Sequence, residues 1–281
     1  MTIREALAAA IPRLASAGVE TARLDAELLL AHVLQQGRTH LFAHPEADLT
    51  IEVTQAYEAL LQRREAREPL PYLLGTWEFL GMPFRVAPGV LIPRPETETL
   101  VEAVAERLPP GARILDVGAG SGCICAGLAR LLPDATILGL EPSPEAIEIA
   151  RQNIESLGFG DRVTLFAGRF PEDAIHLGAL DALVSNPPYI PSAEIDTLAP
   201  ELRCYEPRGA LDGGPDGLEV LGPLTREGAL LVKSGGLFAV EVALDQAEQV
   251  CVLLRSADAW TEPETVPDLA GIPRVVLARR R

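Results

Sequence analysis

Residues 184–190, VSNPPYI, set polar and conformationally stiff side chains directly after an apolar run. A proline fixes its own φ, removes a backbone donor, and pushes the residue before it toward extended geometry. Asn186 and Pro187 both precede a proline, so the chain holds a side-chain amide and a backbone carbonyl in restricted geometry. Taken alone, the stretch also fits an Asx-type turn at a strand end, so its role depends on the other motifs.

A second candidate site is the glycine-rich stretch ILDVGAGSGCI, which runs from an apolar segment into a helical one. Its loop comprises Gly118, Ala119, Gly120, Ser121 and Gly122. Glycines at these positions let the backbone turn sharply and approach a ligand closely. The GxGxG spacing departs from the GxGxxG dinucleotide fingerprint, whose third glycine would fall on Cys123. A tight strand-to-helix turn without a ligand is the simpler alternative for the loop alone.

Two carboxylates near this loop narrow the choice of ligand that it could bind. Asp116 stands just before the first glycine, where it would oppose a pyrophosphate but suit a cationic ligand. S-adenosylmethionine carries a sulfonium and an ammonium group, so the sequence favours it over a dinucleotide. Glu141 ends the next apolar segment, and a carboxylate there can accept hydrogen bonds from both ribose hydroxyls. Alone, Glu141 also fits a solvent-facing strand end or a helix start.

Composition limits the class of protein and its partners. The 281 residues include 24 basic and 40 acidic side chains, for a formal net charge of −16, which repels a nucleic-acid backbone. The four cysteines lack the spacing and the histidine neighbours of a zinc site, so we expect no metal and interpret them as small buried residues. No apolar run approaches the length of a membrane span, and we expect a cytoplasmic protein.

Residues 1–70 read as amphipathic helices that form a small bundle. One helix is expected over residues 22–36, with its end at Gly37. The residues expected on its buried face are Leu24, Leu28 and Ala31. A β-hairpin linker is predicted over residues 71–94, because aromatic and β-branched residues there alternate with glycine and proline.

Residues 95–281 alternate between strand and helix patterns, which predicts an α/β domain with a doubly wound, mostly parallel sheet. The expected strands are ARILDVG, ATILGLE, RVTLFAG, DALVSN and GGLFAVEV, with RVVLARR as an edge strand. Helices are expected after Thr97, Ser121, Ser143 and Asp216.

With these motifs together, the chain resembles class I S-adenosylmethionine-dependent methyltransferases, in which NPPY marks enzymes that methylate planar amino groups. Within them it resembles the PrmC/HemK family of peptide-chain-release-factor glutamine methyltransferases. The stretches that carry this resemblance are EPLPYLLGTWEFLG, GVLIPRPETETLVE, ILDVGAGSGCI, VSNPPYIP and YEPRGALDGGPDGL. The resemblance implies a Rossmann-like domain with a seven-stranded sheet, and a helical N-terminal domain that docks the substrate.

The family resemblance also implies the reaction. The substrate would be the glutamine of the GGQ motif in class 1 release factors, methylated by S-adenosyl-L-methionine to leave S-adenosyl-L-homocysteine. Asn186 and Pro187 would accept the two N–H bonds of the glutamine amide, with Pro188 beside them and Tyr189 packed on the amide plane. Phe170 would pack on the adenine ring. The partners implied are release factors, without direct nucleic-acid or membrane binding, and the enzyme would be a monomer.

Two departures and several alternatives remain open. The ribose-binding acid of the family is commonly aspartate, whereas here it is Glu141, and Arg169 stands where an acidic residue often recognises adenine. The stretch LIPRPETE is expected to form a lid or wall beside the cofactor, although Arg94 and Glu96 equally fit a surface ion pair. Glutamine methylation of a ribosomal protein and amino methylation of a nucleic acid use the same NPPY chemistry.

Overall fold

The computed structural model describes all 281 residues and divides them into two compact units. The helical unit comprises Met1–Thr76 and the distant segment Ala199–Tyr205. The sheet unit comprises Trp77–Leu198 and Glu206–Arg281. No helix in either unit is both long and apolar enough to cross a membrane.

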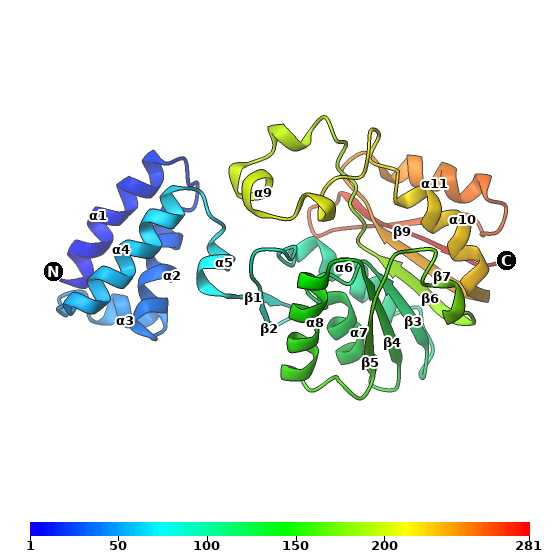
Figure 1. The fold of residues 1–281 in the computed structure, drawn as a ribbon, viewed down its shortest axis with the longest axis horizontal. Coiled ribbons are helices and arrows are strands. Elements are labelled where there is room, and N and C mark those ends of the chain that lie inside the picture. Colours follow the sequence, from blue (N-terminus) through cyan, green and yellow to red (C-terminus); the bar gives the residue numbers. More distant parts are fainter. The chain divides into compact units, whose positions relative to one another are not determined.

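The helical unit is a small bundle whose core is formed by leucine, isoleucine and alanine side chains. Its helices are α1 (Ile3–Ser16), α2 (Ala22–Leu34), α3 (Arg38–Ala43), α4 (Ile51–Glu65), α5 (Leu70–Leu74) and α9 (Pro200–Tyr205) (Figure 1). A complete capping box starts α1, because the Thr2 hydroxyl accepts from the Glu5 N–H while the Glu5 carboxylate accepts from the Thr2 N–H.

The buried face of α2 differs from the predicted one at Leu24, which is 38% exposed. Ala31 is buried as predicted and Leu28 is partly buried, while Asp25, Ala26 and Leu29 are buried as well. The helix also ends earlier than expected, because Gln35 at φ 53° takes the left-handed conformation that closes it. The pattern of apolar residues was misleading because a charged residue, Asp25, belongs to the core-facing side.

A buried ion pair fixes α2 against α4 and binds α9 to the same bundle. The Arg64 Nε atom donates to the Asp25 carboxylate at 2.7 Å, and both side chains are almost fully buried. Arg64 and Arg67 also donate to Glu201 of α9, at 3.0 and 2.6 Å. The Tyr205 hydroxyl donates to the Ala66 carbonyl at 2.7 Å. These bonds explain why a segment so distant in sequence belongs to the helical unit.

The predicted hairpin is present as β1 (Thr76–Phe79) and β2 (Met82–Arg85), although residues 70–74 before it form the short helix α5. The Leu80 N–H at its turn donates to Glu98 at 2.6 Å. The Asn153 side chain bridges β2 and the glycine loop, since it accepts from the Arg85 N–H at 2.7 Å and donates to the Ser121 carbonyl at 2.9 Å.

The seven-stranded, mostly parallel sheet confirms the predicted fold class. Its order is β5-β4-β3-β6-β7-β9-β8, with the first five parallel and β9 antiparallel to both neighbours. The strands are β3 (Arg113–Val117), β4 (Thr136–Glu141), β5 (Val163–Ala167), β6 (Leu180–Ser185), β7 (Val232–Glu241), β8 (Glu264–Pro267) and β9 (Pro273–Arg279). The stretch RVVLARR forms most of β9 and is not the edge strand, because β8, which the sequence analysis missed, pairs outside it.

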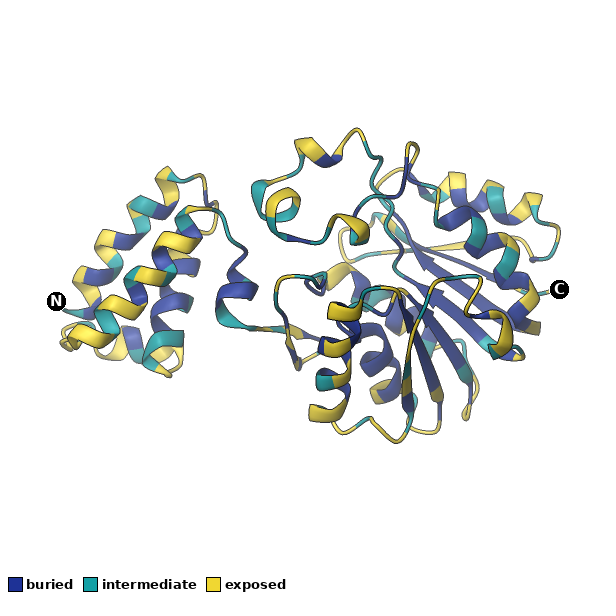
Figure 2. Ribbon diagram, in the orientation of Figure 1, coloured by how far each residue is buried: buried dark blue, intermediate teal, exposed yellow.

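Helices cover both faces of this sheet, whose central strands are buried (Figure 2). One face packs against α6 (Pro95–Ala105), α7 (Cys123–Leu131) and α8 (Pro144–Ser156), and the other against α10 (Leu221–Leu231) and α11 (Ala247–Ser256). Neighbouring strand residues enter opposite cores: Ile114 faces the first set of helices and Leu115 the second.

The Asp25–Arg64 pair gives a stability prediction. Arg64→Ala should lower the free energy of unfolding of the helical unit by about 3–5 kcal/mol, because it leaves a buried carboxylate uncompensated. Arg63→Ala removes the half-exposed pair with Glu68 and should cost less than about 1 kcal/mol. Hydrogen exchange of amides in α2 and α4 measures both changes. Equal protection in the two variants would contradict the assignment.

Candidate active site

A cavity of about 410 Å³ lies at the carboxyl ends of the parallel strands of the sheet unit. Such strand ends are where open α/β sheets bind ligands. The predicted site residues that line it are Gly118, Gly120, Glu141, Phe170, Asn186, Pro187 and Pro188. Five other predicted residues, Asp116, Ala119, Ser121, Gly122 and Tyr189, do not line it.

The glycine loop forms one wall of the cavity. The N–H groups of Gly118 and Ala119 both donate to the Leu140 carbonyl, at 2.8 and 3.1 Å, which holds the loop against the end of β4. A Cβ atom at Gly118 would meet no protein atom within 4 Å, so a side chain there would occupy ligand space. At Gly122 a Cβ would lie 3.3 Å from the Ala150 Cβ, so this glycine permits close packing of α8. One glycine of the loop therefore leaves room for a ligand, and another lets a helix pack closely.

Glu141 is buried at the end of β4 and lines the same cavity. Its Oε2 atom accepts from the Gly120 N–H and its Oε1 atom from the Ser143 N–H, both at 2.8 Å. Burial raises the pKa of Glu141, and the two backbone hydrogen bonds oppose that shift. Each carboxylate oxygen can accept a further hydrogen bond, so the group is oriented and still able to bind a diol.

Asp116 lies beneath the loop, fully buried in the central strand. Its Oδ2 atom accepts from the Cys125 thiol at 3.1 Å, and its Oδ1 atom has no hydrogen-bond partner. Burial raises the pKa of Asp116 to about 7, and the Cys125 hydrogen bond opposes this. A buried carboxylate oxygen without a partner is costly, and a cation or donor on a ligand would relieve that cost.

The stretch predicted as a wall contributes Leu91 to the cavity, and Gly89 just before it also lines the cavity. Arg94 does not pair with Glu96; it pairs with the buried carboxylate of Glu206, whose other oxygen accepts from the Ile92 N–H at 3.2 Å. Glu206 belongs to the YEP motif, so one carboxylate joins two motifs that lie far apart in sequence. The surface ion-pair alternative for Arg94 was therefore wrong.

The NPPY loop is held from behind by residues that the sequence analysis did not single out as functional. The Asn186 Nδ2 atom donates to the Thr97 hydroxyl at 3.1 Å, and the Tyr189 hydroxyl donates to Glu241 at 3.2 Å. The Gln246 side chain donates to the Tyr189 carbonyl at 3.3 Å. Glu241 ends β7 as Glu141 ends β4, and that shared position is the signal that could have revealed it.

Arg169 and Phe170, which follow β5 and Gly168, both line the cavity. Phe170 also packs partly buried against the core beside α10 and α11, so it presents an apolar ring to a ligand. Arg169 is exposed, and its N–H donates to Asp173 at 2.8 Å. The adenine-recognition role of Phe170 stays a prediction.

No group of three or more His, Cys, Asp or Glu side chains has a geometry that could hold a metal ion. Three of the four cysteines are buried as expected, but Cys204 in α9 is exposed, which corrects the expectation for that residue. The short α9 buries none of its own residues, so its cysteine faces out.

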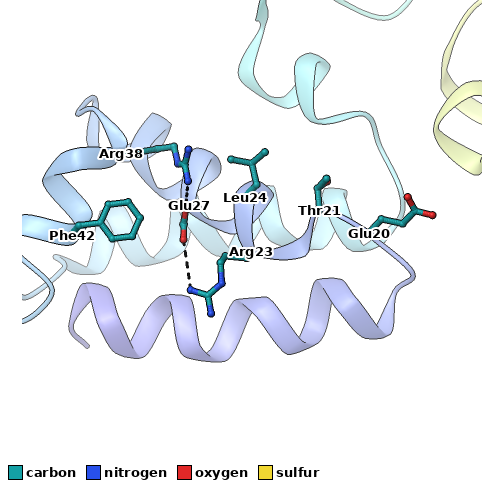
Figure 3. Close-up of a pocket in the computed structure, with 7 residues that line it drawn as sticks. All are labelled: Glu20, Thr21, Arg23, Leu24, Glu27, Arg38 and Phe42. Atoms are coloured by element: carbon teal, nitrogen blue, oxygen red, sulfur yellow. Dashed lines mark hydrogen bonds and ion pairs between the residues drawn. The ribbon is translucent and has the colours of Figure 1, made fainter. Parts of the chain in front are cut away.

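A second pocket, of about 430 Å³, lies in the helical unit (Figure 3). The buried carboxylate of Glu27 lies between two arginines in it, 2.5 Å from Arg38 and 3.9 Å from Arg23. Leu24 and Phe42 border the pocket with 38% and 60% of their surfaces exposed. Both arginines of the pocket thus share one carboxylate.

Comparisons with known proteins agree with both units. Residues 5–75 match the family model of the PrmC N-terminal domain, and residues 108–253 match a methyltransferase domain. The chain is 44% identical to the release factor glutamine methyltransferase of Moorella thermoacetica, with 100% of this chain and 99% of the relative covered. It is 45% identical to that of Geobacter sulfurreducens, with 99% and 96% covered.

This chain belongs to the release factor glutamine methyltransferase family. A solved methyltransferase from Pyrococcus furiosus shares the fold at a TM-score of 0.53 and 19% identity, covering 72% of this chain and 90% of that one. The buried Glu206 bridge joins IPRPETE and YEP, two of the stretches by which the chain resembles this family.

Asp116 gives a pH-dependent stability prediction. Its pKa of about 7 lies above the ordinary aspartate value of 3.8, so the folded state binds this proton more tightly than the unfolded chain. The wild type should therefore lose stability relative to Asp116→Asn as the pH rises from about 4 to about 7, and the difference should then level off. At about 1.4 kcal/mol per pKa unit, the difference amounts to at most about 4 kcal/mol.

Denaturant unfolding of both proteins between these pH values measures the effect. Asp134→Asn, at an exposed position in the same unit, is the matched control and should follow the wild-type profile. Parallel pH profiles for the wild type and Asp116→Asn would refute a raised pKa at this position.

Proposed function

We propose that this chain transfers a methyl group from S-adenosylmethionine to the side-chain amide nitrogen of the glutamine in the GGQ motif of class 1 release factors. The observation that carries the proposal is the meeting of Asn186 and Pro187 with the glycine loop and Glu141 around one cavity. Full-length similarity to release factor glutamine methyltransferases supports it. Because release factors act in translation, the proposal also implies a cytoplasmic enzyme.

The residues around the cavity fit this cofactor. Glu141 has free acceptor capacity for the ribose hydroxyls, and Phe170 offers an apolar face for the adenine ring. Gly118 leaves open space that a bound cofactor could occupy. The unpartnered Oδ1 atom of Asp116 favours a cationic group, and S-adenosylmethionine carries two. When bound, the cofactor supplies a methyl group made electrophilic by the positive sulfur.

Asn186 and Pro187 are suited to receive a primary amide. The Asn186 Nδ2 atom is engaged by Thr97, which leaves its Oδ1 atom to accept from the substrate. The Pro187 carbonyl supplies the second acceptor, and the flanking prolines limit its movement. Two fixed acceptors would hold both N–H bonds of the glutamine amide, which directs its nitrogen lone pair toward the methyl donor.

Position and electrostatics provide the catalysis, because an amide nitrogen is a weak nucleophile whose lone pair is delocalised. Transfer of the methyl group from the positive sulfur to the amide nitrogen would leave a neutral thioether, so the bonds balance without a further reactant. Positive charge that develops on nitrogen is stabilised by the two carbonyl dipoles. One N–H proton then leaves to water, which restores the neutral amide. Orientation of this kind can lower a barrier by roughly 7–11 kcal/mol at its limit.

The central prediction concerns the product and Asn186 together. After incubation with S-adenosylmethionine, a GGQ-containing release factor should gain one CH2 unit on that glutamine, measured by mass spectrometry of its peptides. Asn186→Ala should abolish this gain, because one of the two amide acceptors is lost. Cofactor affinity, measured by calorimetry, should stay within a few-fold of the wild type.

The same assay separates the alternatives. Ribosomal proteins and rRNA are incubated in parallel, and methylation of either in preference to the release factor would replace the proposed substrate. The net charge of −16 disfavours the nucleic acid. Full turnover by Asn186→Ala would remove the proposed role of this side chain.

We further propose that the pocket in Figure 3 docks the body of the release factor. Exposed apolar side chains on an otherwise charged surface mark protein contacts, and Leu24 and Phe42 are such side chains. Arg23 and Arg38 border them and add donors in a strongly acidic protein. The match of residues 5–75 to the PrmC N-terminal domain model supports a role in this family's shared function.

Phe42→Ala should raise the KM for the full-length release factor by roughly 10-fold, as expected for loss of an aromatic anchor. Turnover of a short GGQ peptide, which lacks the body of the release factor, should not change. Ile51→Ala, also exposed and in the same unit, is the control. An unchanged KM for the release factor in Phe42→Ala would exclude docking at this pocket.

A further inference from the structure

A chain of buried hydrogen bonds runs behind the NPPY loop, entirely within the sheet unit. The Asn186 Nδ2 atom donates to the Thr97 hydroxyl at 3.1 Å. The Thr97 hydroxyl donates in turn to the Glu241 Oε2 atom at 2.6 Å, and the Tyr189 hydroxyl donates to the Glu241 Oε1 atom at 3.2 Å. Thr97 and Glu241 are 2% and 1% exposed, so water does not compete for these bonds.

The donors and acceptors of this hydrogen-bond chain run in one fixed direction. An ionised carboxylate only accepts hydrogen bonds, so Glu241 requires the Thr97 hydroxyl to point its proton toward β7. The Thr97 oxygen then offers a lone pair, and not a proton, to Asn186. A side-chain amide can present either its NH2 group or its oxygen, and only the NH2 group satisfies that lone pair. The Asn186 oxygen is thereby turned away from Thr97.

Burial raises the pKa of Glu241 above its ordinary value. The hydrogen bonds from Thr97 and Tyr189 and the nearby Arg274 guanidinium oppose that rise, because they favour the carboxylate form. Burying a carboxylate costs far more than burying a neutral side chain of the same size. In return for this cost, the negative charge sets the direction of the hydrogen-bond chain.

We propose that Thr97 and Glu241 are positioning residues that fix the Asn186 amide with its oxygen toward the substrate. The inference rests on the proposed function, in which that oxygen accepts from the glutamine amide. Neither residue lines the cavity, so both act through Asn186 and neither touches substrate or cofactor. Glu241 also aligns the Tyr189 hydroxyl, which connects both polar side chains of the NPPY motif to one carboxylate.

Paired substitutions at residue 97 test the chain. Thr97→Val keeps the shape of the side chain but removes the hydroxyl, and it should lower kcat for the release factor by roughly 10- to 100-fold, the range for loss of one preorganised polar contact. Thr97→Ser keeps the hydroxyl and should restore most of the turnover. Glu241→Gln should lower kcat in the same way, because a glutamine NH2 group can reverse the direction of the chain. Cofactor affinity should stay within a few-fold in all three.

Thr225→Val is the matched control, since Thr225 is fully buried and its hydroxyl donates to the Gly222 carbonyl within α10, away from the cavity. It should lose thermal stability to a similar extent while keeping its kcat. Wild-type turnover in Thr97→Val would overturn the proposal. Equal losses in Thr97→Val and Thr97→Ser, or losses that follow thermal stability across all variants, would also overturn it by showing a purely structural role.

A measurement without substrate separates this inference from the proposed function. The side-chain NH2 resonances of Asn186 in 15N-labelled enzyme are assigned by their absence in Asn186→Ala. In Thr97→Val they should shift and exchange faster with water, and in Thr97→Ser they should stay close to the wild type. If the wild type fails to methylate release factors, the proposed function fails. The Asn186 resonances still show whether Thr97 holds the Asn186 amide. Unchanged resonances in Thr97→Val would overturn the inference.

Discussion

Parallel pairing of β3 with β4 on one side and β6 on the other is the constraint on which the whole site depends. The register sets Asp116 beside Gly139 of β4 and Val184 of β6, so the three strands end at nearly the same level. The glycine loop, Glu141 and the NPPY loop therefore leave the sheet together. The ladder continues past the strands, because the first two loop amides still bond to the end of β4. Sheet geometry thus brings the glycine loop, Glu141 and the NPPY loop to one edge of the sheet before any ligand arrives.

Acidic side chains buried at this edge of the sheet need hydrogen-bond donors, and each of them has different ones. Glu141 receives two backbone N–H groups, Glu206 receives an arginine and a backbone N–H group, and Glu241 receives two hydroxyls. Asp116 receives only a thiol, which is a weak donor. The first three are therefore satisfied by the protein itself. The fourth keeps one buried oxygen without a partner, so Asp116 is the least satisfied of the four acids.

The sequence predicted what local patterns determine and missed what distant contacts determine. The five parallel strands and the cavity-lining part of the motifs follow from short-range periodicity and from glycine and proline chemistry. Leu24 was assigned to the core because apolar spacing does not reveal that Asp25 has a buried arginine partner 39 positions later. The partner of Arg94 and the strand β8 were missed for the same reason, since both depend on pairing across the fold.

The grouping of α9 with the helical unit bears on how this protein is divided in the laboratory or in evolution. The chain enters that unit twice, once at its start and once through Ala199–Tyr205. A fragment cut at Thr76 would keep Arg64 and Arg67 but lose Glu201, their shared carboxylate. The helical unit is thus not a module that recombination can move as one continuous piece. An exchange between relatives would have to carry seven residues from the middle of the other unit's sequence with it.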